Sequence, residues 1–204
     1  MNPAALSLFE KRGERFLLEI DNLRPEGLKV AGVYCTFAPP ELIRAAGAIP
    51  VGLCGKRQDP IPAAEAELPA NLCPLIKSSY GYAISDTCPF FAAADILVGE
   101  TTCDGKKKAY EAFAAHAPMY VMEVPQQKNP ADLALFRAEL VRFKDKLEAL
   151  TGRAVTAENL RAAIRTANDK RRALQRLNRL RAAVPTPISG RDVLLINQVS
   201  FYDD

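Results

Sequence analysis

The sequence predicts an α/β fold with a mainly parallel sheet and helices on both faces. Four short apolar runs indicate strands: LKVAGVYC at 28–35, IPVGLCG at 49–55, ADILVGE at 94–100 and MYVMEVP at 119–125. Stretches of helical periodicity separate these runs, and strands that alternate with helices favour a parallel sheet. Ligands of such sheets bind at the carboxyl ends of the strands, so a site is expected in the segments that follow the runs.

The first segment, 1–27, is expected to hold one amphipathic helix over 4–23. Its apolar positions recur near helical spacing; they are Leu6, Phe9, Phe16, Leu17 and Ile20. The next segment, 28–128, is expected to be the cysteine-bearing domain.

Helices are also expected between and after the predicted strands of that domain. ELIRAAGA follows two prolines that suit a first helical turn. Residues 56–70 are expected to form a Pro-rich loop, and helices then begin in NLCPLIKSSYGYAI, DTCPFFAAAD and TTCDGKKKAYEAFAAH. We expect Thr101, Thr102 or Asp104 to cap the last of these helices.

The last segment, 129–204, is helical in character. One helix ends at Gly152, and a second, basic helix begins with Thr156 and Glu158. The basic helix keeps an intact apolar stripe, which favours a packed helix over a nucleic-acid-binding one. The apolar run in ISGRDVLLINQVSFYDD stands close to the last residue, so we expect the fold to continue into a second α/β domain that is absent from this chain.

Composition narrows the classes of function. The 204 residues are 49% hydrophobic, which allows a real core, and the net charge of +3 gives no strong field for nucleic acid or acidic membranes. No run approaches the roughly 20 apolar residues of a membrane span, and the N-terminus lacks a secretion signal. We therefore expect a cytoplasmic protein, whose cysteines bind metal, act chemically or are buried rather than forming disulfides.

Five cysteines lie in the first half of the chain, and four of them stand where a strand or loop gives way to a helix. They are Cys35, Cys54, Cys73, Cys88 and Cys103, separated by 19, 19, 15 and 15 positions. A helix N-terminus stabilises an anionic thiolate, so such positions favour a site for a soft metal or an iron–sulfur cluster.

The spacing disfavours zinc, because zinc sites commonly use Cys-x-x-Cys pairs or nearby histidines. The single histidine, His116, ends a helix and is interpreted as a solvated cation rather than as the partner of a cysteine nucleophile. Widely spaced thiolates that a fold brings together suit a cubane iron–sulfur cluster. The alternative is that each cysteine is a small buried hydrophobic residue, and this alternative is strongest for Cys54, which lies inside a predicted strand.

Three segments carry a family resemblance: GVYCTFAPPELIRAAGAIPVGLCG, ANLCPLIKSSYGYAISDTCPFF and GETTCDGKKKAYE. They resemble the 2-hydroxyacyl-CoA dehydratase component D family, which includes benzoyl-CoA reductase subunits. The cysteines in VGLCG and SDTCPFF make the chain most similar to the double-cubane cluster branch. The resemblance implies two Rossmann-like domains with the cluster in the cleft between them, and this chain corresponds to the N-terminal part.

The resemblance also implies ligands. Cys35, Cys73 and Cys103 match the three cysteines that hold a [4Fe-4S] cubane in the family. A double-cubane [8Fe-9S] cluster needs more thiolates, for which Cys88 is the better local candidate and Cys54 the weaker one.

The implied activity is a low-potential radical dehydration of a 2-hydroxyacyl-CoA thioester, or the reduction of a small molecule. The chain would then belong to a lyase or to an ATP-dependent reductase. Its implied partners are an ATP-hydrolysing iron–sulfur activator protein and a second subunit, in a homodimer or in a heterodimer with a related chain.

Several polar residues have two interpretations each. Ser78 and Ser79 could donate hydrogen bonds near the cluster or substrate, or lie on a helix surface. Glu41 could donate a proton, or act as a first-turn partner of the helix dipole. Lys77 and the run 106–108 could attract an anionic substrate or the activator, or form a solvated face.

Two other classes of function stay open at this point. One is a non-catalytic electron-transfer or cluster scaffold protein. The other is a plain α/β domain whose cysteines are structural.

Overall fold

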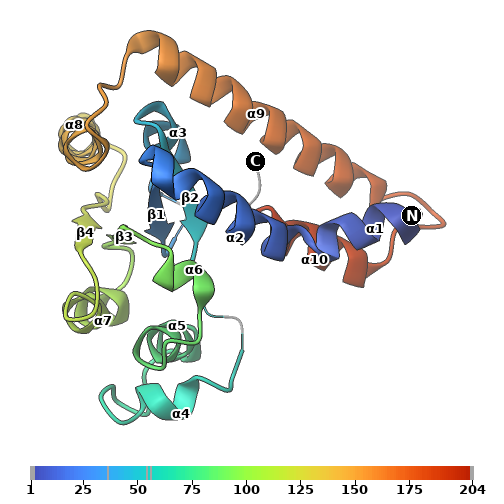
Figure 1. The fold of residues 1–204 in the computed structure, drawn as a ribbon, viewed down its shortest axis with the longest axis horizontal. Helices are drawn as coiled ribbons and strands as arrows, with labels where there is room; N and C mark the ends of the chain where they lie inside the picture. Colours follow the sequence, from blue (N-terminus) through green and yellow to red (C-terminus); the bar gives the residue numbers. More distant parts are fainter. Residues whose placement is uncertain (1–2, 36, 54, 56, 203–204) are drawn as a thin grey trace.

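The computed structural model describes residues 3–35, 37–53, 55 and 57–202, with side chains from residue 6 onward. Its centre is a four-stranded parallel sheet with the strand order β2-β1-β3-β4 (Figure 1). The strands are β1 (Lys29–Val33), β2 (Ala48–Gly52), β3 (Ile96–Glu100) and β4 (Met119–Met122). The α/β prediction is confirmed, and each strand falls on or within one residue of a predicted apolar run.

Helices connect the strands and continue after the sheet. They are α1 (Pro3–Glu10), α2 (Arg12–Leu23), α3 (Pro40–Ala45), α4 (Ile61–Ala64), α5 (Pro74–Ile84), α6 (Pro89–Ala92), α7 (Asp104–Phe113), α8 (Pro130–Thr151), α9 (Ala157–Leu180) and α10 (Gly190–Val199), with a 3-10 turn at Arg24–Glu26.

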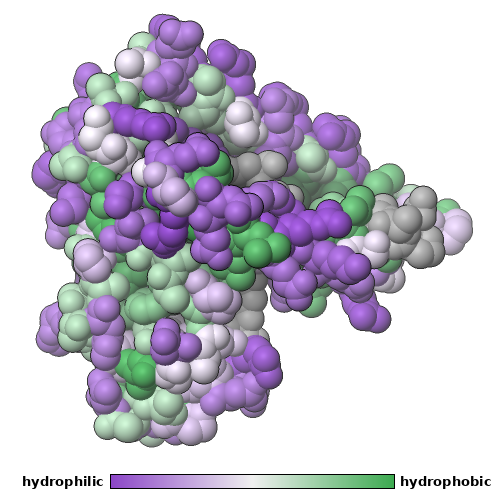
Figure 2. All heavy atoms as spheres, viewed as in Figure 1, coloured by the Kyte–Doolittle hydropathy of each residue, from purple (hydrophilic) through white to green (hydrophobic). Residues whose placement is uncertain are grey.

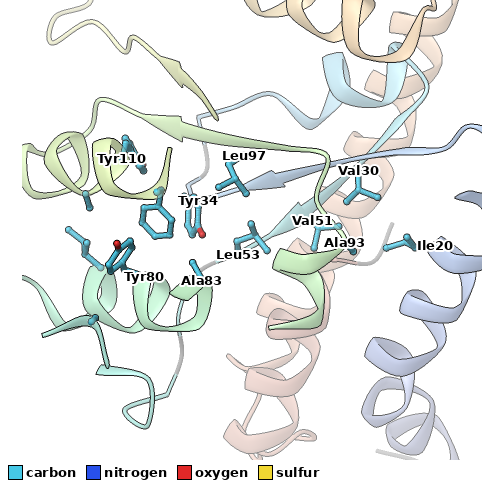
Figure 3. Close-up of a cluster of buried hydrophobic side chains, with 14 of the residues drawn as sticks. Ile20, Val30, Tyr34, Val51, Leu53, Tyr80, Ala83, Ala93, Leu97 and Tyr110 are labelled. Atoms are coloured by element: carbon cyan, nitrogen blue, oxygen red, sulfur yellow. The ribbon is translucent and has the colours of Figure 1, made fainter. Parts of the chain in front are cut away.

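The two faces of the sheet bury separate cores, because alternate residues of a strand point to opposite sides. On one face, Val30 and Leu97 pack with Tyr34, Tyr80 and Tyr110 beneath α2, α5 and α7. Figure 3 shows the three tyrosines converging from the end of β1, from α5 and from α7.

The opposite face is covered by α3 and α8. Ala31 and Val33 of β1 pack there with Ile43 of α3 and with Phe143 and Leu147 of α8. The sheet is therefore the middle layer of three, which leaves the ends of its strands as the open edges.

The N-terminal segment differs from its prediction. Two helices, α1 and α2, replace the single helix expected over 4–23, and they are separated at Lys11. Phe16 and Ile20 of α2 reach the core, whereas Leu18 stays exposed. Of the two N-terminal helices, α2 thus contributes buried residues to the core, and the described side chains of α1 contribute none.

The C-terminal helices follow their predicted signals. Gly152 ends α8 in the left-handed conformation at φ +69°, which glycine adopts without strain. The Thr156 hydroxyl accepts the Asn159 N–H and caps α9. The basic helix α9 packs on α3 and buries Ala163 and Ala167, so it is a packed helix as expected.

The three-part division into 1–27, 28–128 and 129–204 stays a prediction. In the structure, α10 at the far end of the chain lies beside α1 (Figure 1). The first and last segments are thus in contact with each other.

Hydrophilic side chains cover much of the outer helices in Figure 2, with smaller hydrophobic groups between them. Across the described residues, none of the helices has the length and apolarity that crossing a membrane requires.

Gly81 allows the segment before α4 to pack directly on α5. A Cβ at this position would lie 2.0 Å from the Pro60 carbonyl oxygen, whereas a Cβ at Gly190, the first residue of α10, would meet nothing within 4 Å. We expect Gly81→Ala to lower the free energy of unfolding by about 1–3 kcal/mol through overpacking. Gly190→Ala is the matched control and should stay within about 0.5 kcal/mol of wild type in denaturant titrations. Equal effects of the two substitutions would contradict this packing.

Candidate functional site

The strand order changes direction between β1 and β3. From β1 the chain crosses to β2 on one side, and it then returns to β3 on the other side of β1. Such a switch point opens a crevice at the carboxyl ends of the two central strands, where ligands of α/β sheets bind. Cys35 follows β1 by two positions and Cys103 follows β3 by three. The structure therefore brings these two cysteine-bearing segments to the same edge.

Cys73 lies near this edge because it precedes α5, whose first turn lies beside the first turn of α7. A Cβ at Gly105 of α7 would stand 3.0 Å from a methyl carbon of Leu72, the neighbour of Cys73. Tyr34, Leu75 and Lys106 line one small hollow. Three segments that each carry a predicted ligand thus converge, because two helix starts and one strand end are packed together.

Three cysteines stand at the N-cap positions of helices: Cys73 at α5, Cys88 at α6 and Cys103 at α7. The prediction that Thr101, Thr102 or Asp104 caps α7 is wrong. The Thr101 hydroxyl instead accepts the Val124 N–H, and the thiol at the cap makes no capping hydrogen bond. Cys73 and Cys103 are exposed, so their sulfur atoms are not committed to the core.

Cys88 stands at the other end of α5 from Cys73. The helix has 11 residues and is about 16 Å long at 1.5 Å per residue. The Thr87 N–H donates to the Tyr82 carbonyl, which keeps the segment before Cys88 close to the carboxyl end of α5. Cys88 therefore lies away from the end of α5 that carries Cys73, and Cys88 as a ligand stays a prediction. Cys54 lies outside the described residues.

Cys35 has a cationic partner. The Lys106 ammonium lies 2.7 Å from its sulfur, and both residues are half-buried. The next two lysines behave differently: Lys107 pairs with Asp104 and Lys108 pairs with Glu111, both on the exposed side of α7. The predicted solvated face therefore describes Lys107 and Lys108, while Lys106 belongs to the site.

Glu100 is a site residue that the sequence analysis missed. It ends β3, is fully buried, and its Oε1 accepts the N–H groups of Phe37 at 2.7 Å and Ala38 at 2.6 Å. Its Oε2 is buried and, among the described residues, has no hydrogen-bond partner. The carboxylate thus ties the loop after Cys35 to the end of β3. One sign of this role was visible in the sequence: a charged residue, Glu100, ends the otherwise apolar run ILVGE.

Tyr110 of α7 lies next to this carboxylate, and its hydroxyl accepts the Glu100 N–H at 3.1 Å. Burial raises the pKa of Tyr110 to about 12, while the hydrogen bond from Glu100 and the Lys106 charge partly oppose that rise. The neutral phenol is therefore the form that the folded protein favours.

The donors suit a soft metal in kind and place. Thiolates at the starts of α5 and α7 are ligands that iron–sulfur clusters use, and backbone N–H groups at a helix start favour the anionic sulfur. Within the described ranges, however, no group of three or more Cys, His, Asp or Glu side chains is close enough to hold a metal ion. The segments that carry Cys35, Cys73 and Cys103 lie close together, but their thiol groups are not close enough to bind one metal ion.

A family model described as "2-hydroxyglutaryl-CoA dehydratase, D-component" matches residues 35–204. The chain belongs to this family. The match begins at Cys35 and includes every segment of the cysteine edge. The family resemblance inferred from the three motif segments is confirmed.

Two relatives of the dehydratase family extend the comparison. YjiM of Escherichia coli strain K12, which is named provisionally as a dehydratase subunit, is 43% identical over 195 residues that cover 95% of this chain and 51% of YjiM. A benzoyl-CoA reductase subunit of Thauera aromatica is 27% identical over 173 residues that cover 82% of this chain and 44% of that relative. The chain spans about half the length of the curated relatives it matches.

The serines of the dehydratase-family motif IKSSYG lie inside the protein rather than on the helix surface. The Ser78 hydroxyl donates to the Arg57 carbonyl at 2.5 Å, and the Ser79 hydroxyl accepts the Gly55 N–H at 2.8 Å. Both side chains hold the loop after β2 against α5. A further role of Ser78 near a cluster or substrate stays a prediction.

The remaining candidates are engaged in contacts between elements. Glu41 lies in the first turn of α3 and pairs with Arg171 of α9 at 2.5 Å. Lys77 is buried, and its ammonium contacts Glu65 and the Ala70 carbonyl, so it secures the loop before α5 rather than facing solvent. His116 follows α7 at the end opposite Cys103 and is exposed.

The raised pKa of Tyr110 gives the stability of the protein an alkaline dependence. Its stabilising effect is complete below pH 10, the ordinary value for tyrosine, and is lost as the pH rises from 10 towards 12. We expect Tyr110→Phe to remove about 1 kcal/mol of the fall in unfolding free energy between pH 9 and pH 11. Denaturant titrations at both pH values measure it. An identical fall in both proteins would contradict the assignment.

Proposed function

We propose that the chain is the cysteine-bearing part of an oxygen-sensitive enzyme subunit in which Cys35, Cys73 and Cys103 hold an iron–sulfur cluster. One observation carries the proposal: the segments with these three residues converge at the carboxyl edge of the sheet, at the β1/β3 switch point. The carboxyl edge at a switch point is where α/β sheets commonly bind their ligands. Membership of the dehydratase family supports the same assignment.

The proposed reaction is removal of water from a 2-hydroxyacyl-CoA thioester, as the name of the family suggests. The alternative is reduction of a small molecule, since one of the relatives is named as a reductase subunit. When bound, a cluster of this type supplies a low-potential electron and an iron atom that can bind an oxygen atom of the substrate. The chain's own contribution is to place Cys73 and Cys103 at the N-cap positions of α5 and α7, where the helix dipole favours an anionic sulfur.

The proposal includes partners. We propose an ATP-hydrolysing iron–sulfur activator protein as the donor of the low-potential electron, because membership of the dehydratase family implies such a partner. Because the chain spans about half of its relatives, a second α/β unit and a related subunit would complete the cleft. We also propose that the protein works in the cytoplasm and as a dimer.

Cys88 and Cys54 are proposed as the added ligands if the cluster is a double cubane. Cys88 stands at the far end of α5 from Cys73, so it would contribute to a second cubane and not to the first. The iron content per protein therefore distinguishes a single [4Fe-4S] cubane from an [8Fe-9S] double cubane.

Serine substitutions test the ligands directly. In protein prepared without oxygen, we expect Cys35→Ser, Cys73→Ser and Cys103→Ser each to lose most of the bound iron and acid-labile sulfide, because a hydroxyl is a poor ligand for a soft metal. Cys88→Ser is the comparison variant and should keep the iron of the first cubane. Unfolding curves of the iron-free proteins control for stability.

Two results would count against the proposal. One is full iron content in Cys73→Ser or Cys103→Ser. The other is a wild-type protein, extended to the full length of its relatives, that binds neither iron nor sulfide.

A further inference from the structure

Lys106 is the one lysine of the run 106–108 for which the structure gives a contact with sulfur. Its Nζ lies 2.7 Å from Cys35 Sγ, 71 positions away in sequence. Lys107 and Lys108 have carboxylate partners on their own helix. The side chain of Lys106 therefore crosses from α7 to the loop after β1, which are the two sides of the switch point.

Contacts on both sides of the Lys106–Cys35 pair place the two residues next to each other. On the side of α7, Lys106 lines a small hollow together with Tyr34, Leu75 and Tyr110. On the other side, Glu100 accepts the N–H groups of Phe37 and Ala38, which holds the backbone just after Cys35. The loop that carries Cys35 is thus held close to the start of α7, where Lys106 lies.

We propose that Lys106 is a positioning residue that donates an N–H···S hydrogen bond to the Cys35 sulfur and so sets the electron affinity of whatever that sulfur ligates. The proposal rests on the proposed iron–sulfur function for its redox consequence. The contact itself does not depend on that function.

The physical consequence follows from charge. A cluster gains negative charge when it is reduced, and a hydrogen bond from a cation to a ligand sulfur stabilises the more negative state. Lys106 therefore raises the reduction potential of a cluster held by Cys35. Its neighbours Lys107 and Lys108 carry the same charge but point to carboxylates, and so they have a much smaller effect.

The first measurement uses iron-free protein and tests the contact alone. Reductive methylation followed by peptide mass spectrometry gives the relative reaction rates of the lysines. We expect Cys35→Ala to speed the methylation of Lys106 by about fivefold, the equivalent of one lost hydrogen bond, and to leave Lys107 and Lys108 unchanged. An unchanged rate at Lys106 overturns the proposal.

The second measurement uses iron-loaded protein of full length. Lys106→Met keeps the apolar stem and removes the donor, and we expect it to keep its iron but to show a lower midpoint potential than wild type. Lys107→Met is the matched control for loss of one charge on α7 and should keep the wild-type potential. Equal potentials in the two variants overturn the proposal.

A variant with a different donor covers the case in which Lys106→Met binds no cluster. Lys106→Arg keeps a cationic N–H and should restore the iron content and most of the potential. Failure of Arg to restore iron overturns the positioning role. If even the wild-type protein takes up no iron, the proposed function fails, while the methylation rates still decide whether Lys106 holds Cys35.

Discussion

The buried Glu100 carboxylate joins the two central strands at the edge where the cysteines gather. It ends β3, yet it binds the backbone N–H groups of the loop that follows β1. Placing a full carboxylate in the interior is costly unless it is well paired, and here one oxygen accepts two N–H groups while the other has no partner within the described residues. The two hydrogen bonds to Oε1 hold the loop after Cys35 at the end of β3, which an apolar residue at position 100 could not do. The placement of Cys35, of its contact with Lys106, and of the crevice itself depends on this link.

Around that link, the site is assembled from ordinary features of a parallel sheet. Because the strands run in the same direction, the segments after β1 and β3 emerge at one edge, and the first turns of α5 and α7 pack beside them. Helix starts provide N–H groups suited to thiolates, so the fold provides a place for soft-metal chemistry before any metal binds. Two of the helices that pack on the sheet, α5 and α7, also take part in positioning the edge. Ser78 and Ser79 fasten the loop after β2 to α5, and Tyr110 connects α7 to Glu100.

Sequence patterns were sufficient to predict the sheet, the parallel direction of its strands and the starts of the two helices that follow a Cys-Pro pair. The Cys-Pro pairs at 73–74 and 88–89 are local signals, because proline fits the first turn of a helix whatever the rest of the chain does. The contacts made across the fold could not be predicted this way. Nothing in the run KKK distinguishes Lys106 from its neighbours until α7 is packed against β1, and the partners of Glu100 are more than 60 positions away. The burial of Lys77 was missed for the same reason, since its partner Glu65 lies on a separate segment of the fold. The separation of Cys73 from Cys88 by the length of α5 likewise became evident only in the folded structure.

Whether Cys35, Cys73 and Cys103 hold one bound group can be measured by differential alkylation. Iron-loaded and iron-free protein are treated with iodoacetamide without oxygen, and each cysteine peptide is quantified by mass spectrometry. We expect iron to protect all three cysteines together and the protection to be lost on chelation. If any one of the three reacts equally fast in the loaded and the iron-free protein, that cysteine is not a ligand, and a cluster held by all three is excluded.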